Sequence, residues 1–98
     1  MTFIQIIQFR TKRLEEFNAL LDNWLEESKG WRTSSQAMQC RDRDQPDTYI
    51  NIVQFPSHEA AMANSDRPET GAFAERLAEL CDGPPTFRNF DLLRQVDM

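Results

Sequence analysis

The side chains that could carry chemistry in this sequence are few. His58 is the single histidine, and histidine is the residue type whose ordinary pKa lies nearest neutrality, so it is the obvious candidate for a proton acceptor. The alternative is an exposed, inert histidine, because His58 directly follows Ser57 at a predicted helix start, where the helix dipole disfavours the imidazolium. No catalytic signature accompanies it, so any activity has to come from a pocket with a few aimed polar groups.

Aromatic and amide side chains supply the other candidates. Trp31 could form an aromatic pocket wall that donates from its indole N–H, or it could pack as a core residue. Tyr49 and Asn51 share one face of a predicted strand, and a buried Asn51 needs its amide paired by neighbours or by a ligand. Gln5 and Gln8 lie on opposite faces of the first predicted strand, so at most one of them can face a pocket on the helix side.

Composition limits the class of protein. Ninety-eight residues with a formal charge of -5 predict one domain, residues 1–98, with a modest core and no basic surface for nucleic acid. No apolar run approaches the roughly 20 residues that span a bilayer, and MTFIQIIQFR does not have the pattern of a leader. We therefore expect a cytoplasmic protein with no membrane or nucleic-acid partner. Cys40 and Cys81 lack the close spacing of a zinc or redox site and are predicted to be reduced, partly buried thiols.

Hydrophobic periodicity predicts the elements that must position these residues. Strands are expected at residues 3–9, 31–41, 48–55 and 87–96. The turn-rich DRDQPD between the second and third predicts an antiparallel hairpin. A helix of about four turns is expected from Leu14, with Thr11 as its N-cap and Gly30 in a left-handed conformation at its end.

A second helix is predicted to be broken in two. Ser57 caps a short Ala-rich helix, and after an interruption at residues 64–68 a helix restarts, with Asp66 as its N-cap and Pro68 in its first turn. A broken helix cannot lie flat along a sheet, so the break is expected to leave a gap in which a pocket opens. A simple corner in the chain is the alternative.

The resulting order is β-α-β-β-α-β, which is typical of an α+β ferredoxin-like sandwich: a four-stranded antiparallel sheet with its helices on one face. FIQIIQF is apolar on both faces, with Phe3, Ile7 and Phe9 on one and Ile4 and Ile6 on the other. Because the helices cover only one face, the second is expected to meet another copy of the chain in a homodimer.

The sequence resembles the dimeric α/β-barrel superfamily and, within it, the antibiotic-biosynthesis-monooxygenase-like domains. The resemblance covers nearly the whole chain and rests on FIQIIQF, YINIVQFPSHEAAMANS, FAERLAEL and the FRNFDLL that follows DGPPT. It implies an oxidoreductase, a monooxygenase that uses no metal, flavin or haem. A small aromatic or polyketide-like substrate loses a proton, and its anion reacts with O₂ in a pocket between sheet and helices. His58 would be the base, with Asn51 and Trp31 as hydrogen-bond donors.

The residues expected to contact the substrate are Tyr49, Gln5, Asn64 and Phe73. Arg32 and Arg88 could stabilise an oxyanion or could be ordinary surface charges. Two other functions stay open for the same fold: a non-catalytic small-molecule-binding or accessory protein, and an isomerase or cyclase that needs the same base but no O₂. Haem degradation, known in the superfamily, is disfavoured, because the resemblance would require an Asn in the first strand and a histidine in the restarted helix. This chain has Gln5 and Gln8 in that strand and no histidine after His58.

Overall fold

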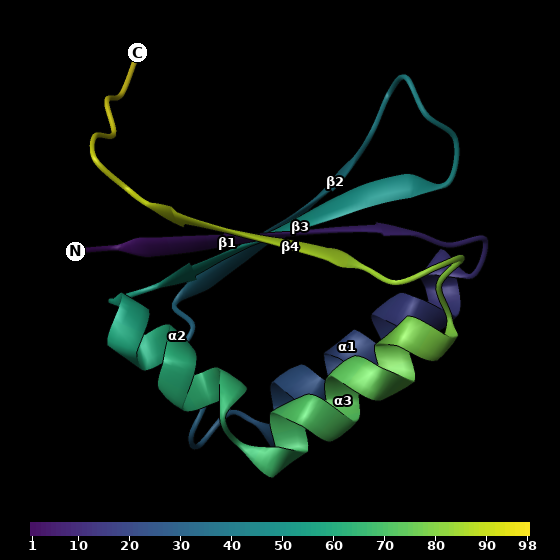
Figure 1. Ribbon diagram of the computed structural model, residues 1–98, viewed down its shortest axis with the longest axis horizontal. Coiled ribbons are helices and arrows are strands. Elements are labelled where there is room, and N and C mark those ends of the chain that lie inside the picture. The colour runs from purple at the N-terminus through teal and green to yellow at the C-terminus, as the bar shows by residue number, and fades with distance from the viewer.

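The computed structural model describes residues 1–98 and contains a four-stranded antiparallel sheet and three helices. The elements are β1 (Phe3–Arg10), α1 (Leu14–Glu27), β2 (Gln36–Arg41), β3 (Thr48–Phe55), α2 (His58–Ser65), α3 (Pro68–Glu79) and β4 (Thr86–Asp91). The strands lie in the order β2-β3-β1-β4, and all three helices are on one face of the sheet, as Figure 1 shows. The predicted ferredoxin-like α+β fold is confirmed.

The central strands β1 and β3 place their odd-numbered residues toward the helices. β1 pairs antiparallel with β3 on one side and β4 on the other. Phe3 lies opposite Phe55, and Phe9 lies opposite Tyr49. All four side chains are buried, so the alternation of a strand puts residues 5, 7, 51 and 53 on the same helix-facing side.

The hydrophobic core is divided into two clusters at opposite ends of these strands. One cluster consists of Phe3, Phe55 and Ala61. The other consists of Phe9, Phe17 and Tyr49. In the second cluster the rings of Phe9 and Phe17 are stacked, with 4.2 Å between their centroids. The middle of β1 and β3 therefore lies between two packed ends and is free to border a cavity.

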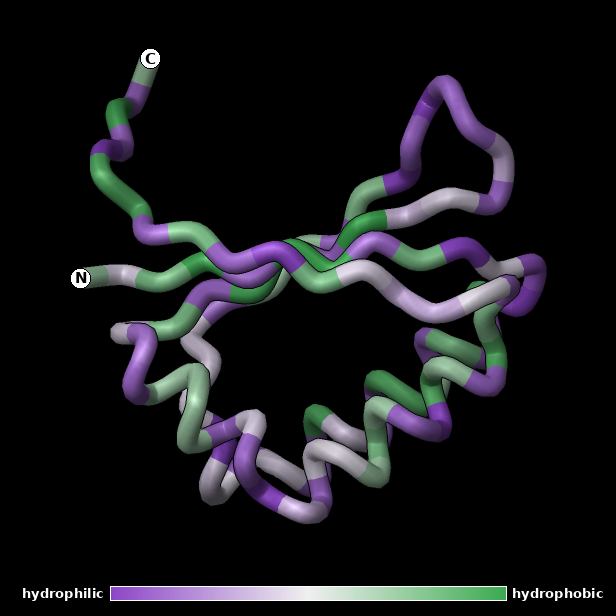
Figure 2. The backbone as a smooth tube through the Cα atoms, viewed as in Figure 1, coloured by the Kyte–Doolittle hydropathy of each residue, from purple (hydrophilic) through white to green (hydrophobic).

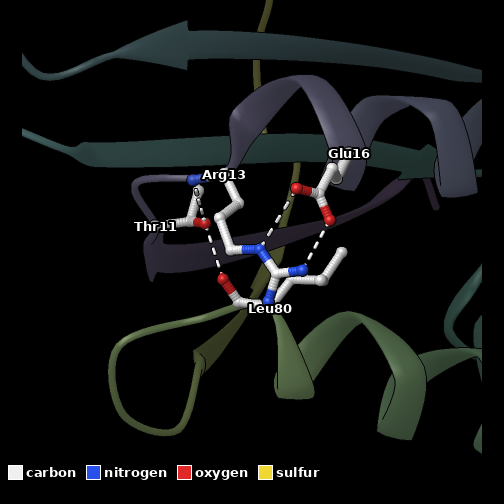
Figure 3. Close-up of polar contacts among 4 residues, drawn as sticks. All are labelled: Thr11, Arg13, Glu16 and Leu80. Carbon is white, nitrogen blue, oxygen red and sulfur yellow. Dashed lines mark hydrogen bonds and ion pairs between the residues drawn. The ribbon is translucent and has the colours of Figure 1, made fainter.

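The loop before α1 is tied to the end of α3 by Thr11 (Figure 3). The Thr11 hydroxyl is fully buried, accepts a hydrogen bond from the Arg13 N–H at 2.9 Å and donates one to the Leu80 carbonyl at 2.6 Å. Arg13 itself occupies the N-cap position without a side-chain cap and forms an exposed ion pair with Glu16 at 2.6 Å. The prediction of Thr11 as N-cap is wrong by two residues, because its side chain joins two segments instead of capping a helix alone.

Thr11→Val is expected to destabilise the protein by about 2–3 kcal/mol, because it removes both hydrogen bonds of the Thr11 hydroxyl, which are partly buried. For a domain of this size that lowers Tm by roughly 10 °C or more. Thermal unfolding measures the change, with Thr86→Val as control, since Thr86 is exposed and its hydroxyl makes no hydrogen bond. Equal Tm values for the two variants would contradict the role given to Thr11.

The end of α1 differs from the prediction at Gly30. The helix ends at the C-cap Ser28, whose hydroxyl donates to the Trp24 carbonyl at 2.6 Å. The left-handed glycine of the chain is Gly83, with φ of 93° after α3, while Gly30 has no positive φ. Gly30 as a left-handed terminator is therefore wrong, because Ser28 already satisfies the last turn of α1.

The predicted break in the second helix separates α2 from α3. We call residues 64–70 the joint between these helices, and Figure 2 shows that it is hydrophilic. Ser57 is the N-cap of α2, as predicted, and its hydroxyl accepts from the Ala60 N–H at 3.0 Å. Asp66, however, is the C-cap of α2, and the N-cap of α3 is Arg67, with Pro68 as the first helical residue. The Asp66 prediction is wrong because proline forces the residue before it out of the helical region, so the new helix can begin only at Pro68.

Two of the predicted strands are shorter in the structure. β2 begins at Gln36, not at Trp31, because the Trp31 N–H bonds back to the Ser28 carbonyl at 3.1 Å and holds this segment in a turn. β4 ends at Asp91, and residues 92–98 form no regular element. The third predicted strand has the same bounds as β3.

The face of the sheet opposite the helices is apolar and uncovered. The centre of this open face consists of Ile4, Ile6, Met38, Ile50, Ile52 and Phe90, and the polar side chains on the same face include Gln8, Gln36, Gln54 and Arg88. Met38 is 61% exposed and Phe90 37%. Cys40 lies on the same face and is exposed, so the prediction of a partly buried thiol is wrong for Cys40 and correct for Cys81, where burial raises the thiol pKa. Both cysteines are free. None of the helices combines the length and apolar character that crossing a membrane requires.

Candidate functional site

A cavity of about 330 Å³ lies between the middle of the sheet and the helices. Twelve of its twenty lining residues are hydrophobic, so its walls are mainly apolar. The lining residues are Gln5, Ile7, Phe17, Leu21, Trp24, Leu25, Arg32, Ser34, Ala37, Asn51, Val53, Phe55, Asn64, Ser65, Thr70, Gly71, Phe73, Ala74, Leu77 and Phe87. This size and composition are typical of a site for a small organic ligand.

The floor of the cavity is the middle of β1 and β3. Ile7 lies opposite Asn51, and Gln5 lies opposite Val53. The alternation that buries a phenylalanine near each end of β1 points Gln5 and Ile7 into the cavity between them. Two amides therefore lie on an otherwise apolar floor.

The Asn51 side chain is held at one end only. It is 8% exposed, and its Oδ1 accepts a hydrogen bond from Gln39 Nε2 at 3.0 Å. Gln39 Nε2 also donates to Asn18 Oδ1 at 2.8 Å, and Asn18 Nδ2 donates to Gln39 Oε1 at 3.0 Å. Asn51 Nδ2 has no partner in the protein. Because its oxygen is engaged, Asn51 presents an NH₂ donor to the cavity.

Gln5 offers the opposite polarity. Its Nε2 donates to Asn89 Oδ1 at 3.2 Å, and its Oε1 has no partner in the protein. The cavity floor thus presents an acceptor at Gln5 and a donor at Asn51. For diagonal neighbours on paired strands these positions lie about 7–8 Å apart.

The aromatic wall of the cavity joins α1 to α3. The rings of Trp24 and Phe73 are stacked, with centroids 4.5 Å apart and planes within 3° of parallel. Trp31 packs edge-on against Trp24 at 5.2 Å and lies outside the lining. Planar rings on this wall suit a planar aromatic ligand.

The joint between α2 and α3 borders the cavity, as predicted, through Asn64 and Thr70. Asn64 Oδ1, Thr70 Oγ1 and the Nε of Arg67 are buried without a hydrogen-bond partner. The Arg67 guanidinium lies 3.8 Å from the Trp31 ring centroid and bonds Glu69 at 2.8 Å, which lowers the pKa of that carboxyl. The joint therefore holds unpaired polar groups beside an apolar space, which is unusual in a packed protein.

Arg32 is the only charged residue in the lining. Its Nη1 donates to the Leu25 carbonyl at 2.7 Å and to Ser28 Oγ at 2.9 Å, which fixes the guanidinium at the C-terminal end of α1. No carboxylate and no imidazole line the cavity. The charge at this site is positive, and no side chain there can act as a base near neutral pH.

The structure brings four of the seven predicted site residues to the cavity and leaves three outside its lining. Gln5, Asn51, Asn64 and Phe73 line it. Tyr49 is buried in the core cluster with Phe9 and Phe17. His58 is exposed, and its ring packs 5.2 Å from that of Phe3. Trp31 packs edge-on against Trp24 and is not part of the cavity lining. These positions favour packing for Trp31 and Tyr49 and the exposed alternative for His58, while the roles of the other four stay predictions.

Sequence reasoning missed Gln39 and Asn18, which orient Asn51. The usable signal was the predicted hairpin, because its register sets Gln39 opposite Asn51. The predicted strand ends on either side of the turn did not give that register, because Arg41 pairs with Tyr49 and not with Thr48, the first residue of β3. Asn18 could not be found in this way, since its contact depends on how α1 crosses the sheet.

Gly71→Ala is expected to stabilise α3 by about 1 kcal/mol, because alanine is the better helix former and the added Cβ meets no atom within 4 Å. Tm should rise by roughly 4–8 °C. Gly83→Ala should lower it, since Gly83 has a φ of 93° that a side chain disfavours. A falling Tm for Gly71→Ala in thermal unfolding would contradict the free space seen at that position.

No family model matches the chain, and no curated protein does. Solved structures do. SnoaB, a cofactor-independent oxygenase from Streptomyces nogalater, has a TM-score of 0.81 at 16% identity, covering 99% of this chain and 98% of that chain. A candidate antibiotic biosynthesis monooxygenase from Caulobacter crescentus has 0.79 at 11%, covering 95% and 91%. One from Bordetella bronchiseptica has 0.77 at 14%, covering 95% and 98%.

These likenesses span nearly whole chains on both sides, while the sequences have diverged to 11–16% identity. Similarity at that level establishes a common fold, whereas activity has to be argued from the site. The chain has the fold of the antibiotic-biosynthesis-monooxygenase-like structures.

Proposed function

We propose that the protein is a cofactor-independent monooxygenase of the antibiotic-biosynthesis-monooxygenase-like family and acts on a small aromatic or polyketide-like phenol or anthrone. The observation that carries the proposal is the free NH₂ of Asn51 in the middle of an apolar cavity of this fold. Such a donor stabilises negative charge on a ligand oxygen more strongly there than in water.

The electrostatics of the cavity favour a substrate bound as its anion. Arg32 supplies the only charge in the lining, and Asn51 supplies a donor, whereas no carboxylate opposes a negative ligand. No side-chain base lines the cavity, so the substrate is expected to lose its proton to water and His58 has no role in this reaction. Phenols and anthrones suit this requirement because their anions are delocalised.

The reaction balances for an anthrone. Its methylene carbon loses a proton, and the resulting anion gives one electron to O₂. The two radicals combine into a peroxide at that carbon, which loses water to leave a carbonyl group. One oxygen atom enters the product and the other leaves as water, so the substrate supplies all four electrons. Asn51 and Arg32 stabilise the enolate and peroxide oxygens, and Trp24 with Phe73 orients the ring.

Two further parts of the proposal concern assembly and location. The open face is expected to pack against that of a second copy, because an uncovered apolar patch on a small protein favours association. We also propose that the homodimer is cytoplasmic and uses no cofactor.

Oxygen uptake with a panel of anthrones and hydroquinones tests the proposed activity. Wild-type protein, treated with chelator, should consume one O₂ for each ketone formed from an anthrone. His58→Ala should retain this activity, because His58 lies outside the cavity lining. Loss of turnover in His58→Ala with an unchanged Tm would restore a histidine base, and no uptake with any compound would oppose the oxygenase.

A non-catalytic binding protein is the second candidate, and the absence of a base from the lining favours it. The same absence opposes an isomerase or cyclase, which would have to return the proton to a different atom of the substrate and has no side chain in the lining to carry it. Quenching of tryptophan fluorescence by an aromatic ligand without oxygen uptake would support the binding protein.

A further inference from the structure

The amide of Asn51 is part of a chain of three amides from three elements. Asn18 lies on α1, Gln39 on β2 and Asn51 on β3, and the sheet register sets Gln39 directly opposite Asn51. We propose that Gln39, which does not line the cavity, is a positioning residue that determines which end of the Asn51 amide faces the ligand. The inference rests on the proposed function only for the identity of that ligand.

The hydrogen bonds prevent the Gln39 amide from turning independently of its neighbours. Both hydrogens of its NH₂ are used, one on Asn18 Oδ1 at 2.8 Å and one on Asn51 Oδ1 at 3.0 Å. Asn18 Nδ2 returns a bond to Gln39 Oε1 at 3.0 Å, so the two amides form a reciprocal pair. Turning Gln39 alone would set oxygen against oxygen and nitrogen against nitrogen in that pair.

The orientation of the Gln39 amide determines that of the Asn51 amide through the hydrogen bond between them. A planar amide whose oxygen is engaged on one side must direct its NH₂ to the other, and the space bordering Asn51 is the cavity. A ligand atom that meets Asn51 must then be an acceptor, such as a carbonyl, phenolate or peroxide oxygen. The reverse orientation would require a hydroxyl donor, so the polarity of the site depends on a residue that never touches the ligand.

Gln39 contributes little to the packing of the protein. Its side chain and its bond to Asn18 are exposed, and only its bond to Asn51 is partly buried. Exposed hydrogen bonds of this kind have small effects on stability. A substitution at Gln39 should therefore change ligand binding more than it changes folding.

Gln39→Glu is the sharpest variant, because it keeps the size and shape of the side chain and replaces its only donor by an acceptor. A carboxylate at this position can accept from Asn18 and Asn51 but donate to neither. Asn51 must then turn its NH₂ toward the carboxylate and its oxygen toward the cavity.

Gln36→Glu controls for the added negative charge. It places the same charge on β2 but on the opposite face, where Gln36 is exposed and makes no side-chain bond.

The first readout needs no ligand. Proton exchange of the Asn51 side-chain NH₂ with water is measured by NMR, its signals being identified by their loss in Asn51→Asp. The Asn51 NH₂ is free in wild type and becomes hydrogen-bonded to the carboxylate in Gln39→Glu. It should therefore exchange roughly tenfold more slowly in the variant. Gln36→Glu should exchange at the wild-type rate. Similar rates in wild type and Gln39→Glu would overturn the inference.

The second readout is the binding of 1,8-dihydroxyanthraquinone, an aromatic diketone that presents acceptors. Gln39→Glu should bind this probe about tenfold more weakly than Gln36→Glu, with an unchanged Tm. Equal losses in the two variants would assign the effect to charge and would overturn the inference. If wild type binds no probe, the proposed function fails, and the exchange rates alone still decide the orientation of Asn51.

Discussion

Asn51→Asp is expected to lower the turnover number for an anthrone by about 100- to 1,000-fold, the usual cost of losing one oxyanion donor. Aspartate has the shape of asparagine, and its carboxylate can still accept the bond from Gln39, so the fold should be kept. It offers no donor to the cavity, however, and it places a negative charge against a substrate bound as an anion. The loss is measured as kcat from oxygen uptake, with Tm recorded beside it.

Asn89→Asp is the matched control for this prediction. Asn89 lies on the helix-facing side of β4 opposite Gln5, its Oδ1 accepts from Gln5, and it does not line the cavity. The same chemical change there should leave kcat within about twofold, because the carboxylate keeps the bond to Gln5 and stays exposed. Equal losses in the two variants would show that Asn51 has no special part in turnover.

Ile52→Glu is expected to convert a homodimer into a monomer. Ile52 lies near the centre of the open face, opposite Ile6 on one side and Met38 on the other. A carboxylate there would lose its hydration among these apolar neighbours when two open faces pack together, which costs several kcal/mol. Sedimentation equilibrium should report twice the 11.5 kDa chain mass for wild type and the single mass for the variant.

Ala19→Glu on the exposed side of α1 is the control for Ile52→Glu and should remain dimeric. Cys40 gives a second readout, because its thiol lies on the open face and should react faster with an alkylating reagent in the monomer. A wild-type protein that sediments as a monomer at micromolar concentration would contradict the proposed assembly.

The parts of the fold that were predicted from sequence are those set by local periodicity. The alternation in FIQIIQF and TYINIVQF identified the two central strands and their two faces, and the 3.6-residue stripe from Leu14 identified α1. The errors fell at element ends. Thr11 looked like an N-cap because threonine commonly caps, but the position of α3, far along the chain, decided where its hydroxyl points.

The site was predictable to the extent that strand alternation fixes direction. Alternation predicted that Tyr49 and Asn51 share a face and that Gln5 and Gln8 lie on opposite faces, but it did not predict which face meets the helices. The structure has Gln5 and Asn51 on that side. His58 and Trp31 were predicted as site residues because of their residue types. Both lie near the ends of predicted elements, and no local sequence pattern gives the distance from such an end to a cavity. Asn64 lines the cavity because the break in the second helix, marked by Pro68, turns the chain there.

The division of the core into clusters at the two ends of the central strands bears on how such a protein can evolve. The phenylalanines and the tyrosine at the strand ends form the packed core, so the residues between them contribute less to stability. Substitutions in this middle zone can change which ligand binds without lowering the stability of the protein below the level that function requires. A lineage with this arrangement can exchange one substrate for another while keeping its architecture, in keeping with structures that share one shape at 11–16% identity.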